Sequence, residues 1–258
     1  MNEIVETYID DKLVKVLAKE YNPLDYNEQL IHLLSFAYPS VSFDGWEKFK
    51  LHQLVNDIVI SKHNGEQVLK YYLFKNFYRK KVIGAFEIKV NNSRADFLTI
   101  NGSTNSFEIK SSLDNLYKLK KQAADYIQAF EYNYLVIDEK HLDNAYELVP
   151  KSFGLWSFKN GRKKIYRDAT LNKKIDPEIQ ISLLTKKDLQ HCFSEVSGNR
   201  RQILKYFTEE EINYRFKLAL KSKYSTRWNF LIKNIDLILP VDIQFFFKTN
   251  INPKHIYY

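Results

Sequence analysis

The sequence is poor in the residues that stabilise small secreted proteins and in those that interrupt helices. Its 258 residues include one cysteine, Cys192, together with seven glycines and six prolines. A lone cysteine forms no disulfide within a monomer, which is consistent with a reducing cytoplasm. The apolar runs are too short to cross a bilayer, and the polar, acidic N-terminus lacks the pattern of a signal peptide. These absences predict a cytoplasmic protein without a membrane partner.

Several well-known ligand-binding patterns are missing as well. The six histidines have no spacing that is typical of a metal site, and no Cys–His motif surrounds Cys192 to support a nucleophile. There is no glycine-rich phosphate loop and no internal repeat. The candidate chemistry therefore has to come from carboxylates and lysines.

Charge is distributed unevenly along the chain. Residues 1–150 carry 18 Lys and Arg against 21 Asp and Glu, whereas residues 151–258 carry 21 against 10. The overall net charge of +8 is thus the difference between a slightly acidic first part and a strongly basic second part. A basic region beside an acidic patch is expected of a protein that binds a polyanion, and nucleic acid is the predicted partner.

The most informative stretch lies between Arg94 and Lys110. Asp96 opens one apolar strand pattern, an Asn-Gly turn follows, and a second strand ends in Glu-Ile-Lys. Side chains alternate between the faces of a strand, so Glu108 and Lys110 share one face. A loop of residues 101–103 puts Asp96 opposite Glu108, and a loop two residues longer puts it opposite Lys110. Both registers gather two carboxylates and one ammonium group on one patch of sheet.

This grouping suits a divalent cation and a phosphodiester. Two neighbouring carboxylates repel each other unless a hard cation lies between them, and Mg²⁺ prefers oxygen ligands. The carbonyl of Ile109 offers a further oxygen. A lysine beside the ion can position or deprotonate the attacking water and stabilise developing charge. The sequence therefore predicts a site for Mg²⁺ or Mn²⁺ with Asp96, Glu108 and Ile109 as ligands and Lys110 as catalytic lysine.

An aspartate followed by a hairpin pattern and Glu-x-Lys resembles the core of the PD-(D/E)xK nuclease superfamily. The resemblance covers roughly residues 66–158, and Ala95 stands where the superfamily name has proline. A longer string is similar to small, mostly uncharacterised bacterial and phage proteins assigned to that superfamily: Arg94-Ala95-Asp96, Phe107-Glu108-Ile109-Lys110-Ser111, Leu113-Asp114-Asn115-Leu116, and then Leu119, Gln122 and Tyr126.

The resemblance implies further site residues. In the superfamily a glutamate on the first core helix often joins the metal site, and Glu66 lies at the corresponding place. Glu87, on the first expected strand, is the alternative ligand. Gln122 and Tyr126 match a Q-x-x-x-Y element that follows the catalytic lysine, which makes Gln122 a candidate for holding a phosphate or ordering Lys110. Tyr126 is expected mainly to pack.

The expected fold is α/β: a restriction-endonuclease-like core, with a mixed central sheet flanked by helices, between N-terminal helices and a basic, mainly helical C-terminal region. The predicted regions are residues 1–62, 63–168 and 169–258. Periodicity and capping residues predict helices and strands as follows. Helices are expected at about 3–21, 26–37, 45–59, 66–78, 113–130, 185–193, 200–207, 208–221 and 226–238, and strands at about 82–90, 94–100, 106–110, 134–138, 153–158 and 163–167.

Basic residues beside aromatic ones indicate where a nucleic acid would bind. The expected hairpin of residues 153–167 carries many lysines and arginines around an Asn-Gly turn, and more basic residues follow in the C-terminal helices. The predicted nucleic-acid-binding residues are Lys118, Arg162, Lys163, Lys164, Arg200 and Arg201.

Three functions are compatible with these sequence features. The leading one is a Mg²⁺- or Mn²⁺-dependent endonuclease that acts on DNA rather than RNA, with a role in phage defence or mobile-element conflict implied by the resemblance. The second is a catalytically silent nuclease-fold module that binds nucleic acid or a protein. The third is an interaction protein whose C-terminal helices mediate assembly, as a homodimer or with a protein partner.

Overall fold

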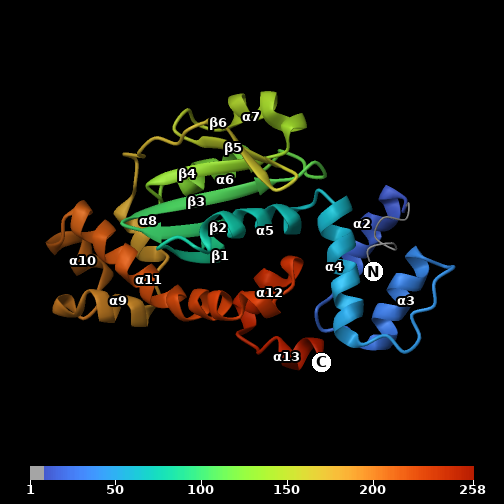
Figure 1. Cartoon of the computed structure of the whole chain (residues 1–258). Coiled ribbons are helices and arrows are strands. Elements are labelled where there is room, and N and C mark those ends of the chain that lie inside the picture. The colour runs from blue at the N-terminus through green and yellow to red at the C-terminus, as the bar shows by residue number, and fades with distance from the viewer. Residues whose placement is uncertain (1–8) are drawn as a thin grey trace. The chain divides into compact units, whose positions relative to one another are not determined.

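The computed structural model describes residues 9–258, which form two compact units (Figure 1). The first unit comprises the described residues up to Tyr71 together with Asn229–Tyr258, and the second comprises Tyr72–Trp228. The C-terminal region expected from the sequence is thus divided between the two. Residues 169–228 belong to the unit that contains the sheet, and the remainder belongs with the N-terminal helices.

The second unit is built on one six-stranded mixed sheet, in the order β1-β2-β3-β4-β5-β6. β3, β4 and β5 are parallel to one another, and the remaining neighbours are antiparallel. The α/β class and the mixed sheet with flanking helices are therefore confirmed. The strands are β1 (Ile83–Val90), β2 (Ser93–Asn101), β3 (Ser103–Lys110), β4 (Tyr132–Ile137), β5 (Gly154–Lys159) and β6 (Arg162–Arg167).

The register of the β2–β3 hairpin decides which residues face each other at the candidate site. Ile100 pairs with Thr104, and the ladder runs down to the pair of Phe97 and Phe107. Gly102 at the tip has a φ of +73°, a left-handed conformation that glycine adopts without strain. Of the two registers left open by the sequence, the shorter loop is confirmed, and continuing it puts Asp96 in line with Glu108.

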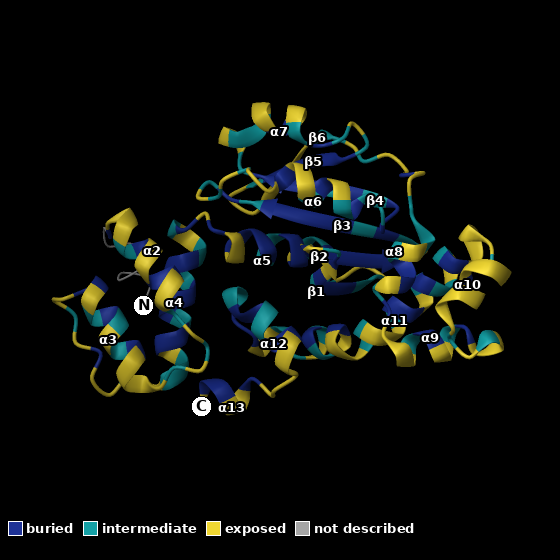
Figure 2. Cartoon of the chain, turned by 180° about the vertical axis from the view of Figure 1, so that it is seen from behind, coloured by how far each residue is buried: buried dark blue, intermediate teal, exposed yellow. Residues whose placement is uncertain are grey.

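One face of the sheet, which we call the aromatic face, is packed with rings. Phe97, Phe107 and Trp156 contact Phe77 of α5 (Glu66–Phe77), whose last residues belong to this unit. Trp228 of α11 (Glu209–Lys233) also lies against Phe97. Burying each such ring contributes roughly 1.5–3 kcal/mol, so these contacts hold the strands in register. Figure 2 shows β2, β3 and β4 buried along much of their length.

The opposite face, which we call the α6 face, carries the polar residues of the site. α6 (Leu119–Tyr126) connects β3 to the parallel strand β4, as expected for a crossover. The predicted helix of residues 113–130, capped at Ser111-Ser112, was wrong in its bounds. The carboxylate of Asp114 accepts hydrogen bonds from the Ser111 amide at 2.7 Å and hydroxyl at 2.6 Å, which holds a non-helical turn after β3.

The rest of the second unit is helical. The expected break between residues 221 and 226 is absent, because α11 contains no proline or glycine between its first and last residues. α9 begins at the predicted capping residue Thr185, whose hydroxyl accepts from the Asp188 amide. Two helices of this unit, α7 and α8, were not predicted. The shorter helices of the second unit are α7 (Leu142–Leu148), α8 (Pro177–Ser182), α9 (Lys186–Cys192) and α10 (Arg200–Tyr206).

The first unit contains the remaining helices. The first four of them correspond to predicted helices, although the expected start of the first one, at residue 3, lies outside the described residues. The short helices after Pro240 were not predicted. The unit comprises α2 (Asp11–Glu20), α3 (Asn27–Ala37), α4 (Lys48–Lys62), the beginning of α5, the end of α11, α12 (Ile243–Thr249) and α13 (Lys254–Tyr257). No helix in the described part of the chain is long and apolar enough to cross a membrane.

A buried carboxyl group ties the C-terminal segment to the N-terminal helices of the first unit. Asp242 is fully buried, and its Oδ2 accepts hydrogen bonds from the hydroxyls of Tyr21 at 3.0 Å and Tyr257 at 2.7 Å and from the amide of Asn56 at 3.5 Å. Burial raises the pKa of Asp242 to about 7, and these hydrogen bonds limit the rise. The network explains why residues far apart in sequence form one unit.

A second buried carboxylate joins α11 to the sheet. Glu131 accepts hydrogen bonds from the Lys217 ammonium at 2.8 Å, the Asn213 amide at 2.9 Å and the Thr104 main-chain amide at 2.7 Å. Burial by itself would raise the pKa of Glu131, but the bonds from Lys217, Asn213 and Thr104 outweigh it and lower the pKa below its ordinary value. The ionised form is therefore the one that stabilises the fold.

Replacing Glu131 tests this connection. We expect Glu131→Gln to lower the free energy of unfolding at neutral pH by roughly 1–3 kcal/mol, because three donors lose a charged acceptor. The native pKa is depressed, so the contribution is present above the unfolded pKa and is lost as the pH falls through the native pKa. Denaturant unfolding of both proteins should show the difference shrinking in acid. Glu147→Gln, an exposed change on α7, should have little effect at either pH.

Candidate functional site

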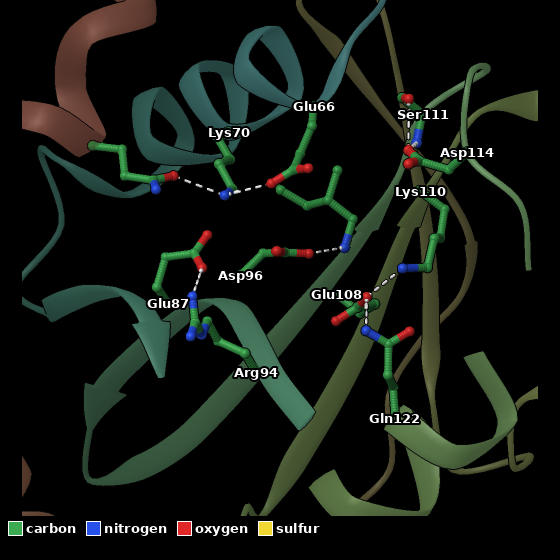
Figure 3. Close-up of polar contacts among 12 residues, drawn as sticks. Glu66, Lys70, Glu87, Arg94, Asp96, Glu108, Lys110, Ser111, Asp114 and Gln122 are labelled. Carbon is green, nitrogen blue, oxygen red and sulfur yellow. Dashed lines mark hydrogen bonds and ion pairs between the residues drawn. The ribbon is translucent and has the colours of Figure 1, made fainter. Parts of the chain in front are cut away.

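Asp96 lies where β2 and β3 separate. The paired ladder ends at Phe97 and Phe107, and beyond it the Asp96 carboxylate accepts a hydrogen bond from the main-chain amide of Ile109 at 2.7 Å (Figure 3). A side-chain oxygen thus binds the backbone of the neighbouring strand. This anchors the carboxylate at the carboxyl-terminal end of β3, beside the Glu108–Lys110 segment.

Glu87 faces Asp96 from β1. The pairs on either side, Phe86 with Phe97 and Ile88 with Ala95, put Glu87 directly opposite Asp96. One carboxylate oxygen of each lies within 4.8 Å of the other. Glu87 also has a φ of +59°, which is rare and strained for a residue with a side chain. The structure therefore brings together one of the two alternative glutamates and the predicted aspartate.

Two cationic or polar groups border this carboxylate pair. Arg94 is largely exposed, and its guanidinium lies 3.3 Å from the Glu87 carboxylate. The Ile109 amide points toward Asp96, whereas the Lys110 carbonyl accepts from Asp138 on the other side of β3. Because the N–H and C=O of one strand residue point to the same side, the Ile109 carbonyl is directed toward β2. The donors available here are oxygens, the ligands that a hard cation prefers.

Glu108 is held in a separate, buried network. Its carboxylate accepts from the Lys110 ammonium and the Gln122 amide, each at 2.5 Å (Figure 3). It also accepts from the Tyr126 hydroxyl at 2.6 Å. Only about 1% of Glu108 is exposed. Among the described residues, the group of carboxylates with adjacent ligand atoms contains Glu87 and Asp96 but not Glu108. The metal-ligand role of Glu108 stays a prediction.

The charges of Glu108 and Lys110 are set by burial and by each other. Burial raises the pKa of Glu108, and the neighbouring ammonium and hydrogen bonds oppose this rise. Burial would lower the pKa of Lys110, but the charge and hydrogen bond of Glu108, followed by the charges of Asp96 and Asp114, outweigh it and raise the pKa. Lys110 is thus an ammonium ion at neutral pH. In this arrangement it can position a ligand and stabilise negative charge, but it cannot accept a proton.

Glu66 occupies the first turn of α5, in the first unit. Its carboxylate forms an ion pair with Lys70 at 2.5 Å, and Lys70 donates to the side chain of Gln244 at 2.7 Å. About half of the Glu66 side chain is exposed. Its role as a further metal ligand stays a prediction.

The predicted nucleic-acid-binding residues lie on three parts of the second unit. Lys118 precedes α6 and is exposed, and Arg200 and Arg201 are exposed in the first turn of α10. On β6, Arg162, Lys163 and Lys164 are exposed, and the Lys163 ammonium lies over the Trp156 ring at 4.1 Å from its centroid. Lys163 therefore points to the aromatic face and packs there.

Sequence reasoning assigned Tyr126 to packing and missed its hydroxyl as a donor to Glu108. The signal was present, because Gln122 and Tyr126 are four residues apart and lie on the same side of a helix. The pairing of Arg94 with Glu87 had no comparable signal, because it depends on the register of β1 with β2.

The fold and these side chains define an α/β protein whose mixed sheet carries carboxylates and a partly buried lysine at the carboxyl-terminal end of β3. The family described as Bacteriophage P4 protein cII matches residues 62–246, and the chain belongs to this family. Protein cII of Enterobacteria phage P4 is 25% identical over 140 residues, which is 50% of this chain and 53% of the phage protein. The chain thus matches about half the length of this curated relative.

One solved structure is similar over part of the chain. It is a protein of unknown function from Silicibacter pomeroyi, with 20% sequence identity and a TM-score of 0.35. The similarity covers 54% of this chain and 89% of that protein.

Removing the Tyr126 hydroxyl tests the buried network. We expect Tyr126→Phe to lower the free energy of unfolding by about 1–3 kcal/mol, because a buried carboxylate oxygen of Glu108 loses its donor. Tyr117→Phe removes the same hydroxyl from a residue that is 92% exposed, and it should change stability by no more than about 0.5 kcal/mol. Equal stabilities of the two variants in urea would contradict the role of Tyr126.

Proposed function

We propose that this protein is a metal-dependent endonuclease that hydrolyses phosphodiester bonds in DNA. The observation that carries the proposal is the placement of the Glu87–Asp96 carboxylate pair beside the Glu108–Lys110 ion pair at one end of the sheet. The residues match the D…ExK pattern of the PD-(D/E)xK superfamily, which supports a nuclease-like core. Membership of a family named after a phage protein supports a role in phage or mobile-element conflict.

The donor set fits Mg²⁺ or Mn²⁺. Glu87 and Asp96 contribute carboxylate oxygens that lie close together, and the Ile109 carbonyl is directed to the same side. In our proposal these groups hold the ion, with Glu66 as the predicted additional ligand. The chemistry that a bound ion supplies is polarisation of the phosphoryl oxygen and acidification of a water molecule.

The chain's own residues then bind the phosphate and orient the water. Hydrolysis joins the water oxygen to phosphorus, breaks one P–O ester bond and delivers a proton to the leaving oxygen. Lys110, protonated and directed by Glu108, stabilises the negative charge that develops on the phosphoryl oxygens. Gln122 restricts Glu108 through its hydrogen bond and so keeps Lys110 in place.

A second function is favoured by one observation. The Glu108 carboxylate accepts three hydrogen bonds, from Lys110, Gln122 and Tyr126. Such an arrangement also suits a nuclease-fold module that binds nucleic acid or a protein partner without cutting. Metal binding and cleavage separate the two functions.

Cleavage is the first test. We expect wild-type protein to cut supercoiled plasmid or single-stranded DNA only with Mg²⁺ or Mn²⁺. Asp96→Asn and Lys110→Gln should each reduce the rate by at least about 100-fold, because the first removes a charged metal ligand and the second removes the positive charge that stabilises the reacting phosphate. The exposed changes Asp143→Asn and Lys151→Gln are matched controls and should cut normally. DNA binding without cutting by any form would favour the silent module.

Metal binding is measured separately by calorimetric titration with Mn²⁺. We expect Asp96→Asn and Glu87→Gln each to weaken binding by at least about tenfold, because each removes a charged ligand. Glu66→Gln in the same series tests the predicted additional ligand, and Asp143→Asn serves as control. Identical titrations for wild type, Asp96→Asn and Glu87→Gln would exclude the carboxylate pair as a metal site.

A further inference from the structure

The strand register shows where Lys110 lies relative to the basic hairpin formed by β5 and β6. Lys110 of β3 pairs with Ile137 of β4. Val136 of β4 pairs with Trp156 of β5, so Ile137 is level with Ser157, and Ser157 pairs with Lys164 of β6. Lys110 and Lys164 therefore lie in one row across the sheet. β3, β4 and β5 are parallel, so their carboxyl-terminal ends lie at the same end of the sheet.

The same register places three basic side chains of the hairpin on the α6 face, with Lys110. Residues directly opposite on neighbouring strands share a face, so Lys164 shares the face of Lys110. Lys159 and Arg162 pair with each other. Each lies two residues closer to the hairpin turn than Ser157 and Lys164, respectively, and therefore shares their face. The position of Lys163 over Trp156 supports this alternation independently, because it puts the intervening lysine on the aromatic face.

The hairpin also borders a cavity that is lined mainly by cationic side chains. A cavity of about 560 Å³ is lined by four cationic residues and one carboxylate: Lys159, Arg162, Lys163 and Lys164, with Asn160 and Glu139. Glu139 follows β4, and its carboxylate accepts from the Tyr166 hydroxyl and pairs with Lys164 at 3.3 Å. The lining of this cavity is therefore mainly positively charged. One of its residues, Lys164, lies in the same row of the sheet as Lys110.

We propose that Lys159, Arg162 and Lys164 form a clamp for the backbone phosphates of a DNA duplex whose scissile phosphate lies at Lys110. This inference rests on the proposed nuclease function and adds the path of the substrate. The charge of the three residues complements a phosphate backbone, and the row from Lys110 to Lys164 makes the clamp continuous with the candidate site. The backbone crosses the carboxyl-terminal ends of β3, β4 and β5.

The separation of the strands sets the distance between the clamp residues and the scissile phosphate. Three strand separations of about 4.8 Å each lie between β3 and β6, which gives roughly 14 Å. In the proposed complex the helix axis follows this row, and B-form DNA rises about 3.4 Å per base pair along its axis, so the clamped phosphates lie about four base pairs from the scissile phosphate.

The test measures affinity for a short DNA duplex across a series of salt concentrations, with EDTA present so that no hydrolysis intervenes. We expect Lys159→Gln/Arg162→Gln to reduce the slope of log affinity against log salt by about two, because two phosphate contacts are lost. Lys186→Gln/Lys187→Gln on α9 removes the same charge from exposed positions and should leave the slope unchanged. Both pairs are exposed, so neither change should unfold the protein.

A second measurement locates the contact. Single neutral methylphosphonate linkages are moved along one strand, and the loss of wild-type affinity should peak about four base pairs from the cut. That peak should vanish in Lys159→Gln/Arg162→Gln. A slope difference in EDTA for a duplex that wild-type protein does not cut when Mg²⁺ or Mn²⁺ is supplied in a separate assay would support the clamp and overturn the nuclease. Equal slopes for wild type and hairpin variant, with cutting intact, would overturn the clamp alone. A hairpin-dependent slope with an RNA duplex but not with DNA would overturn the choice of DNA.

Discussion

The packing of Phe97 against Phe107 is the contact on which the candidate site depends. These rings face each other across β2 and β3 and lie within a larger aromatic cluster that includes Phe77 and Trp156. A slip of one residue would move every side chain of a strand to the other face, so burial of the rings specifies the register strongly. That register puts Asp96 level with Glu108, and both reach the site only because apolar packing elsewhere fixes the strands.

The charged residues at the site form two separate pairs. Glu87 and Asp96 lie close together, which is costly for two negative charges unless a cation compensates them. Glu108 and Lys110 compensate each other, and hydrogen bonds from Gln122 and Tyr126 satisfy the buried carboxylate. A buried ion pair contributes little net stability.

Membership of the phage P4 protein cII family and the geometry of the site address different questions. The family covers residues 62–246, and thus the whole sheet-containing unit together with part of the helical one. The positions of the carboxylates and of Lys110 support a phosphodiester substrate. In the proposed function the basic β5–β6 hairpin gives that substrate a direction, because Lys164 lies in the same row of the sheet as Lys110.

Local patterns were sufficient for much of the fold. Alternating apolar residues predicted all six strands, and the Asn-Gly turns predicted the β2–β3 and β5–β6 hairpins, because these signals act between neighbours in the chain. The bounds of α6 were missed, since the turn held by Asp114 and Ser111 competes locally with a helix. The continuity of α11 was missed as well, although the absence of proline and glycine from it was already visible in the sequence.

The sequence by itself determined the mixed α/β architecture and named Asp96, Glu108, Lys110 and Gln122 as neighbours, because hairpin spacing and the crossover limit where they can lie. Only the tertiary structure decided how the charges pair. The closeness of Glu87 to Asp96 depends on the β1–β2 register, and the engagement of Glu108 by Tyr126 depends on how α6 packs on the sheet. Such pairings join distant segments, and no local pattern in the chain encodes them.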